Sequence, residues 1–175
     1  MKKRSLIIAA LLFAASASLV WAQEAPKKVL SAKDVSAFIS NYDSIQTDMD
    51  ALGDKYDDFF DMEDETAADP GAMIAYVRGL SIPAEIQGVF KKNGFGDNGF
   101  EKFIVISYGA SVIYMEEMMA TQMDEYKDMP EMQAYIEQAS AGVKAMRETL
   151  HDSDLSLIKA RKDELIALLM EEGEE

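Results

Sequence analysis

Apolar residues recur at alternating three- and four-residue steps along much of this 175-residue chain. The first run follows Ser31 and consists of Val35, Phe38, Tyr42, Ile45, Met49, Leu52, Tyr56 and Phe59. This spacing places the apolar side chains on one face of a helix, and Ser31 followed by Asp34 is typical of a helix start. The pattern predicts one continuous helix over residues 31–59. An alternative stays open, in which polar residues 41–44 cap a second helix and the chain bends near Tyr42.

Two short helices are expected next. The acidic run Asp61 to Asp69 interrupts the apolar pattern, and Asp69-Pro70 is typical of a cap followed by proline at the first helical position. This cap predicts a short helix from Gly71 to Arg78. Pro83 begins another helix, which ends at Asn93-Gly94 because glycine commonly follows the last helical residue.

A long helix is expected from about Asn98 to Tyr126, with Asp97 as its cap. Its segment Phe103 to Met115 contains no charged residue and is apolar on nearly every side. A helix of this kind is buried, and the segment is too short to span a bilayer. The β-branched residues 104–106 would also suit a strand, but the length and the lack of turn residues favour a helix. We expect this helix to be the centre of the fold.

Two helices complete the pattern. Asp128 and Pro130 mark the start of the first, whose apolar positions are Met132, Ile136, Ala139, Val143, Met146 and Leu150. The second begins near Ser153 and runs through Leu155, Ile158, Leu165 and Leu168. The predicted fold class is therefore all-α: a single-domain helical bundle of five to six helices with a buried central helix. This domain covers residues 31–172 and is followed by an acidic tail, 173–175.

The first 22 residues have the three parts of a secretory signal peptide. Lys2, Lys3 and Arg4 are followed by an apolar run from Leu6 to Ala17, and Val20-Trp21-Ala22 forms a cleavage site with a small last residue. We expect a signal peptide over 1–22, a short linker over 23–30, and a periplasmic or secreted protein that is soluble after cleavage. The alternative is a retained anchor, since 5–22 is uncharged and near the lower limit of a spanning length.

Composition limits the partners. The chain contains 17 basic and 32 acidic residues, and the expected signal holds three basic residues and no acid, so the mature chain would carry 14 against 32, a net charge of −18. Such a surface repels nucleic acid and anionic lipid. The absence of cysteine excludes disulfides, thiolate metal sites, thiol nucleophiles and a lipid anchor attached to cysteine.

Three segments give the chain a family resemblance. They are 35–39 (VSAFI), 89–103 around Asn93-Gly94-Phe95, and 155–165 with the sequence KARKD at 159–163. In these segments the chain resembles the small, uncharacterised all-helical proteins that bacteria export. The resemblance implies no catalytic or ligand role. A looser likeness to exported helical chaperones rests on helix content, methionine and export.

Two motifs suggest chemistry but have simpler structural explanations. Residues 94–99 (GFGDNG) match the dinucleotide fingerprint G-x-G-x-x-G, which requires a preceding strand. A helix is expected there instead, so Gly94 is interpreted as a C-cap and Asp97 as an N-cap. The acidic run beginning at Asp61 lacks the sixth-position glycine of a calcium loop, since Thr66 stands there. It is interpreted as a hydrated loop.

His151 is the only histidine, and it follows Glu148 at the Glu-x-x-His spacing of carboxylate di-iron bundles. Such a site needs a second copy of the motif, which the chain lacks, so His151 is interpreted as a cation near a helix C-terminus. No G-x-S-x-G elbow is present. The adjacent acids Glu116 and Glu117 point apart on a helix, which is poor geometry for shared acid-base work. We therefore expect no enzyme activity and no cofactor.

Methionine is the remaining candidate. Within 18 residues lie Met115, Met118, Met119, Met123, Met129 and Met132. Thioethers at helical spacing could hold Cu(I), with Met115, Met118, Met119 and Met123 as the candidate ligands. Methionine is also an adaptable core filler and a component of surfaces that repack around varied partners.

The leading hypothesis is a non-enzymatic binding or interaction protein of the cell envelope, including a chaperone-like protein that holds hydrophobic segments. The alternatives are a Cu(I)-binding protein and a carrier of a hydrophobic ligand. The expected partners are a protein or a hydrophobic ligand, with no nucleic acid and no membrane insertion after cleavage.

Overall fold

A computed structural model of the chain describes residues 26–56 and 72–171, and every regular element in these ranges is helical. The elements are α1 (Ala32–Asp50), the 3-10 helix η1 (Gly53–Tyr56), α4 (Ala72–Gly79), α5 (Ala84–Lys92), α6 (Gly99–Glu125), α7 (Pro130–Glu148), α8 (Asp152–Lys159) and α9 (Lys162–Glu171). The expected all-α class is confirmed. The expected number of helices is too low, because the described ranges alone contain seven α-helices.

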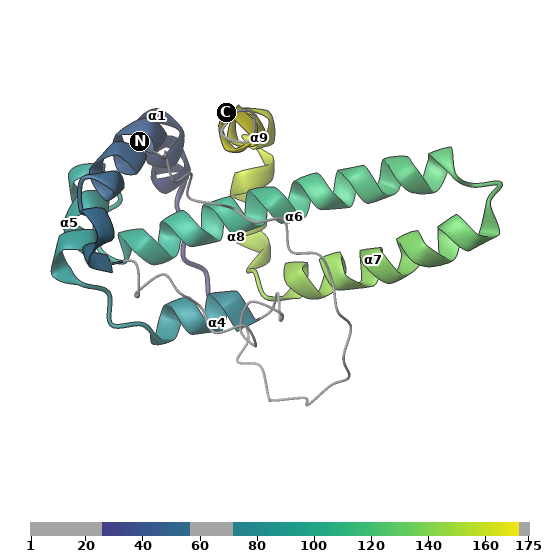
Figure 1. The fold of residues 1–175 in the computed structure, drawn as a ribbon, viewed down its shortest axis with the longest axis horizontal. Helices are drawn as coiled ribbons and strands as arrows, with labels where there is room; N and C mark the ends of the chain where they lie inside the picture. Colours follow the sequence, from purple (N-terminus) through teal and green to yellow (C-terminus); the bar gives the residue numbers. More distant parts are fainter. Residues whose placement is uncertain (1–25, 57–71, 172–175) are drawn as a thin grey trace.

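The long helix α6 organises the molecule and contacts α1, α4, α5, α7, α8 and α9. Figure 1 shows it along the long axis, with α1 and α5 near its first turns and α7 returning beside its second half. Val105, Ile106, Val112 and Ile113 are at most 3% exposed. The expected burial holds only for the first part of α6, because no residue after Ile113 in this helix is buried. In the described part of the chain, α6 alone is long and apolar enough to cross a membrane, a test that core helices of soluble proteins also pass.

An aromatic cluster closes the core at the N-terminal end of α6. It contains Phe38, Tyr42, Phe90, Phe95, Phe100 and Phe103, and the ring centroids of its contacting pairs lie 4.9 to 6.4 Å apart. Tilted and edge-to-face arrangements predominate, as the quadrupoles of aromatic rings favour. The cluster ties together α1, α5, the turn between α5 and α6, and α6 itself.

The first helix begins as expected and ends earlier. The backbone N–H of Ser31 donates to Asp34 Oδ2 (2.8 Å), and the N–H of Asp34 donates to Ser31 Oγ (3.4 Å), which is a capping box. The alternative bend near Tyr42 is wrong, since α1 is unbroken there. The continuous helix over 31–59 is also wrong, because α1 stops at Asp50 and Gly53 takes a positive φ of 62°. Phe59, at the end of the expected run, lies outside the described residues.

The turn from α5 to α6 explains the glycine-rich motif structurally. Gly94 N–H donates to the Lys91 carbonyl (3.2 Å) and Phe95 N–H to the Phe90 carbonyl (3.1 Å). These two bonds, with Phe95 packed on Phe90, form a Schellman C-cap, and Gly94 has the positive φ (91°) that it requires. The expected C-cap is confirmed.

The expected N-cap of α6 is wrong. Asn98 occupies the cap position in a left-handed conformation and makes no side-chain capping bond. Asp97 is exposed and pairs with Lys91 (3.1 Å) instead. Gly99 allows the close approach of α5, since a Cβ there would lie 2.4 Å from the Phe90 Cβ.

The C-terminal part of the chain contains three helices, whereas the sequence predicted two. Pro130 begins α7 as predicted. The single last helix is wrong, because Ala160 and Arg161 separate α8 from α9. Ile158 and Leu165 are both fully buried on either side of this break. The turn therefore redirects the chain so that both helices reach the core.

Candidate functional site

The distal parts of α6 and α7 form a two-helix element, here named the distal hairpin and defined as residues 114–139. Figure 1 shows them projecting together beyond the other described helices. Ile136 is the one buried residue within this range, at 1% exposure. It does not belong to the main apolar core cluster, which includes Val143 on the next turns of α7. The hairpin therefore has a small apolar seam between its two helices, separate from the main core.

The methionines lie in and around this seam. Met115, Met118, Met119 and Met123 are all half-buried, and Met115 packs against the edge of the main core. Met132 is half-buried on α7, whereas Met129, just before α7, is 53% exposed. Tyr135 is 66% and Tyr114 36% exposed. The sequence left open whether the methionines of α6 belong to the core or to the surface. In the structure their side chains are partly buried and partly exposed.

Carboxylates border these apolar side chains. The distal hairpin contains seven acidic residues and one lysine, a net charge of −6. Glu116 pairs with Arg147 of α7 (3.0 Å) and Glu117 with Lys162 of α9. The two adjacent acids thus reach different helices, as their spacing predicted. The other five are exposed, and no cation of the described residues pairs with them: Asp124, Glu125, Asp128, Glu131 and Glu137.

His151 has a structural role that the sequence analysis did not identify. It is the N-cap of α8, and its Nδ1 accepts a hydrogen bond from the Ser153 N–H (3.1 Å). It therefore lies just after the C-terminus of α7, as expected, and also acts as an acceptor at the start of α8.

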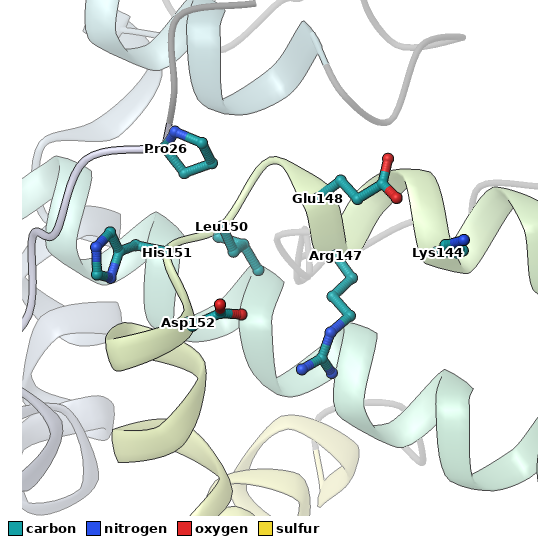
Figure 2. Close-up of a pocket in the computed structure, with 7 residues that line it drawn as sticks. All are labelled: Pro26, Lys144, Arg147, Glu148, Leu150, His151 and Asp152. Carbon is teal, nitrogen blue, oxygen red and sulfur yellow. The ribbon is translucent and has the colours of Figure 1, made fainter.

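A shallow hollow adjoins His151 at the junction of α7 and α8. Its volume is about 380 Å³, and it is lined by Pro26, Lys144, Arg147, Glu148, Leu150, His151 and Asp152. Figure 2 shows Glu148 and Arg147 extending in different directions from α7. Arg147 donates to Glu116 at 3.0 and 3.1 Å, so its charge is already compensated. The lining of the hollow combines two cations with two acids, so it presents no concentration of charge of one sign.

Metal sites built on carboxylate and imidazole receive no support from the described residues. No group of three His, Asp or Glu side chains there lies close enough to hold an ion. The Glu148–His151 pair thus has no second half in that part of the chain. The acidic run Asp61 to Asp69 lies outside the described residues.

Two buried carboxylates hold the segment before α1, and the sequence analysis identified only Asp34, as part of the helix start. Asp154 is 1% exposed, and its two oxygens accept the N–H groups of Val29 (2.8 Å) and Leu30 (3.0 Å). Asp34 accepts the next N–H, from Ser31. The backbone N–H groups of three consecutive residues thus donate hydrogen bonds to carboxylates. The Leu30 side chain is buried. The expected linker over 23–30 is anchored at its end, a contact that only the fold creates.

Asp34 also joins α1 to α6. Lys102 Nζ donates to Asp34 Oδ1 and to the Phe95 carbonyl, both at 3.0 Å. Burial alone would raise the pKa of Asp34, but hydrogen bonds from Ser31 and Lys102 outweigh it and hold that pKa below its ordinary value. This network is structural, since it closes the turn between α5 and α6 over α1.

The chain matches no protein-family model, and neither the curated proteins nor the solved structures contain a match to it.

Proposed function

We propose that the protein is a non-enzymatic interaction protein of the cell envelope, exported by its N-terminal segment, and that it binds partners through the distal hairpin. One observation carries the proposal. The hairpin keeps methionine and tyrosine side chains accessible on a two-helix projection that the described core does not cover.

The side-chain chemistry supports this role. Methionine has three rotatable bonds and a polarisable sulfur, so it adapts to partners of different shape. Tyrosine buries a large ring while keeping its hydroxyl in water. Exposed Met129 and Tyr135 supply such contacts at the tip, and half-buried Met123 and Met132 would become accessible after small rotamer changes. A chaperone-like protein that holds hydrophobic segments needs a surface of this kind.

The test compares two sets of serine substitutions in the mature protein. Met129→Ser with Tyr135→Ser removes the exposed apolar groups of the hairpin. Met170→Ser is the matched control, because this methionine is 44% exposed but lies on α9. We expect the wild type and the control to suppress aggregation of an unfolded client, and the hairpin variant to lose this effect. Equal suppression by both variants would overturn the proposal.

Cu(I) binding is a second candidate because four half-buried thioethers lie within nine residues of α6. Soft thioether ligands select Cu(I). The test is a Cu(I) titration of the wild type and of a Met118→Leu, Met119→Leu variant, which keeps side-chain volume and removes two sulfurs. Binding no tighter than that of free methionine would end this candidate. A carrier function has less support, because the hollow near His151 is lined mainly by charged side chains.

A further inference from the structure

We infer that the partner of the distal hairpin is a basic amphipathic segment of another protein, in which lysine or arginine alternates with apolar residues. The inference rests on the proposed function and specifies the chemistry of the partner. It combines the accessible apolar side chains of the hairpin with the carboxylates that border them.

The acids at the tip of the hairpin, unlike Glu116 and Glu117 nearer the core, form no ion pair with a described cation. Asp124, Glu125, Asp128 and Glu131 lie within eight residues around the tip, all of them exposed. Lys127 is the one cation of the hairpin, and no ion pair joins it to these acids. Like charges this close together repel one another, so a cationic partner would relieve repulsion as well as gain attraction.

The apolar groups are interleaved with these acids. Met129 stands between Asp128 and Glu131 in sequence, and Tyr135 lies one helical turn after Glu131. Both side chains are more than half exposed. A segment that placed apolar side chains on Met129 and Tyr135 would bring its flanking basic groups beside the carboxylates. An amphipathic helix has this arrangement of one apolar face with charged borders.

Other occupants fit less well. A second copy of the chain would bring the same net charge of −6 against the hairpin, and anionic lipid would be repelled in the same way. An uncharged hydrophobic ligand would cover the tyrosine and methionine but would not pair with the carboxylates. It would also displace water from beside these charges, which costs free energy. The basic amphipathic segment satisfies both kinds of group.

The experiment measures binding of three synthetic peptides of about 18 residues to the whole mature protein by fluorescence anisotropy. The first contains lysine and leucine at amphipathic spacing, the second replaces lysine with glutamate, and the third replaces leucine with serine. We expect only the first to bind well, with an affinity that falls about tenfold or more between roughly 50 and 500 mM salt.

Charge-neutralising variants localise the site. The variant Asp124→Asn, Asp128→Asn, Glu131→Gln removes three carboxylates of the hairpin. The control Asp43→Asn, Asp50→Asn, Asp152→Asn removes three exposed carboxylates elsewhere. Both change the net charge equally, so a nonspecific attraction to the acidic protein weakens equally in both. We expect the hairpin variant to bind the lysine-leucine peptide about tenfold more weakly than the control does.

The outcomes separate the inference from the proposed function. Equal binding of the glutamate-leucine peptide, or equal loss in the two charge variants, overturns the inference. The proposed function survives in that case if Met129→Ser with Tyr135→Ser still abolishes client protection. If none of the peptides binds and this serine variant protects clients as well as Met170→Ser does, both fail.

Discussion

The two halves of α6 belong to one unbroken helix and have opposite surroundings. From Gly99 to Ile113 nine residues are buried, and they pack into a core shared with α1, α5 and α8. From Tyr114 to Glu125 none is buried, and the helix continues beside α7 as part of the distal hairpin. The change occurs within one turn and coincides with a change from β-branched and aromatic residues to methionine and glutamate.

This difference has a physical reason. β-Branched and aromatic side chains have few rotamers, so they specify one packing arrangement and suit a core. Methionine changes rotamer at little cost and suits a surface that meets different partners. The first half of α6 should therefore determine global stability, and the second half should determine binding. Four predictions test this division.

The largest loss is expected for Phe90→Ala in the aromatic cluster. Phe90 is 1% exposed and contacts Phe95, Phe100 and Phe103, with ring centroids 5.4 to 6.0 Å away. The free energy of unfolding should fall by about 3–5 kcal/mol because a large cavity opens among these rings. Urea unfolding followed by circular dichroism measures it. A loss no larger than that of Met118→Ala in the hairpin would contradict the division.

The next largest effect is expected for Asp154→Ala in α8. This substitution leaves the N–H groups of Val29 and Leu30 without their acceptor and should cost about 2–4 kcal/mol. Hydrogen exchange should show faster exchange of these two amides. Asp152→Ala is the control, because Asp152 is exposed two residues away. Similar losses in both variants would mean that the anchor of the N-terminal segment contributes nothing.

Several features of the fold follow from local sequence rules, and these features could be predicted from the sequence. The capping box at Ser31, the glycine cap at Gly94 and the start of α7 at Pro130 depend on neighbouring residues only. The central position of α6 followed from its uncharged segment Phe103 to Met115. Rules of this kind do not detect the end of α1, since the apolar spacing continues past Gly53 while the backbone there takes a positive φ.

The features that could not be predicted depend on distant parts of the chain. No glycine or proline marks the break at Ala160 and Arg161, which serves to bury both Ile158 and Leu165. The bonds from Val29 and Leu30 to Asp154 join residues 125 and 124 positions apart. In the candidate site, the sequence identified the methionines, but only the fold shows which of them are exposed and which acids lack a cation.

A smaller effect, and one that depends on pH, is expected for Asp34→Asn. Hydrogen bonds hold the pKa of Asp34 below its unfolded value, so its contribution is present above about pH 4 and is lost as the pH falls through the folded pKa. At neutral pH the variant should lose about 1–2 kcal/mol because Lys102 keeps only a neutral partner. Below about pH 4 the wild type should approach the variant.

Urea midpoints measured from about pH 7 down to about pH 2.5 follow this convergence. Glu131→Gln in the hairpin is the control, since Glu131 makes no ion pair with a described residue. Its curve should run parallel to that of the wild type. A gap between wild type and Asp34→Asn that stayed constant in acid would show that the hydrogen bonds to the ionised carboxylate do not contribute to stability.

The smallest effect on stability is expected for the substitutions at the tip of the distal hairpin, for which we expect the largest effect on binding. Met129→Ser and Tyr135→Ser remove side chains that are more than half exposed, so the free energy of unfolding should change by less than about 0.5 kcal/mol. Thermal and urea unfolding of the same variants used in the client assay measure this. A stability loss as large as that of Asp154→Ala would mean that the tip supports the core. The division of α6 into a stabilising half and a binding half would then be wrong, because one set of contacts would serve both purposes.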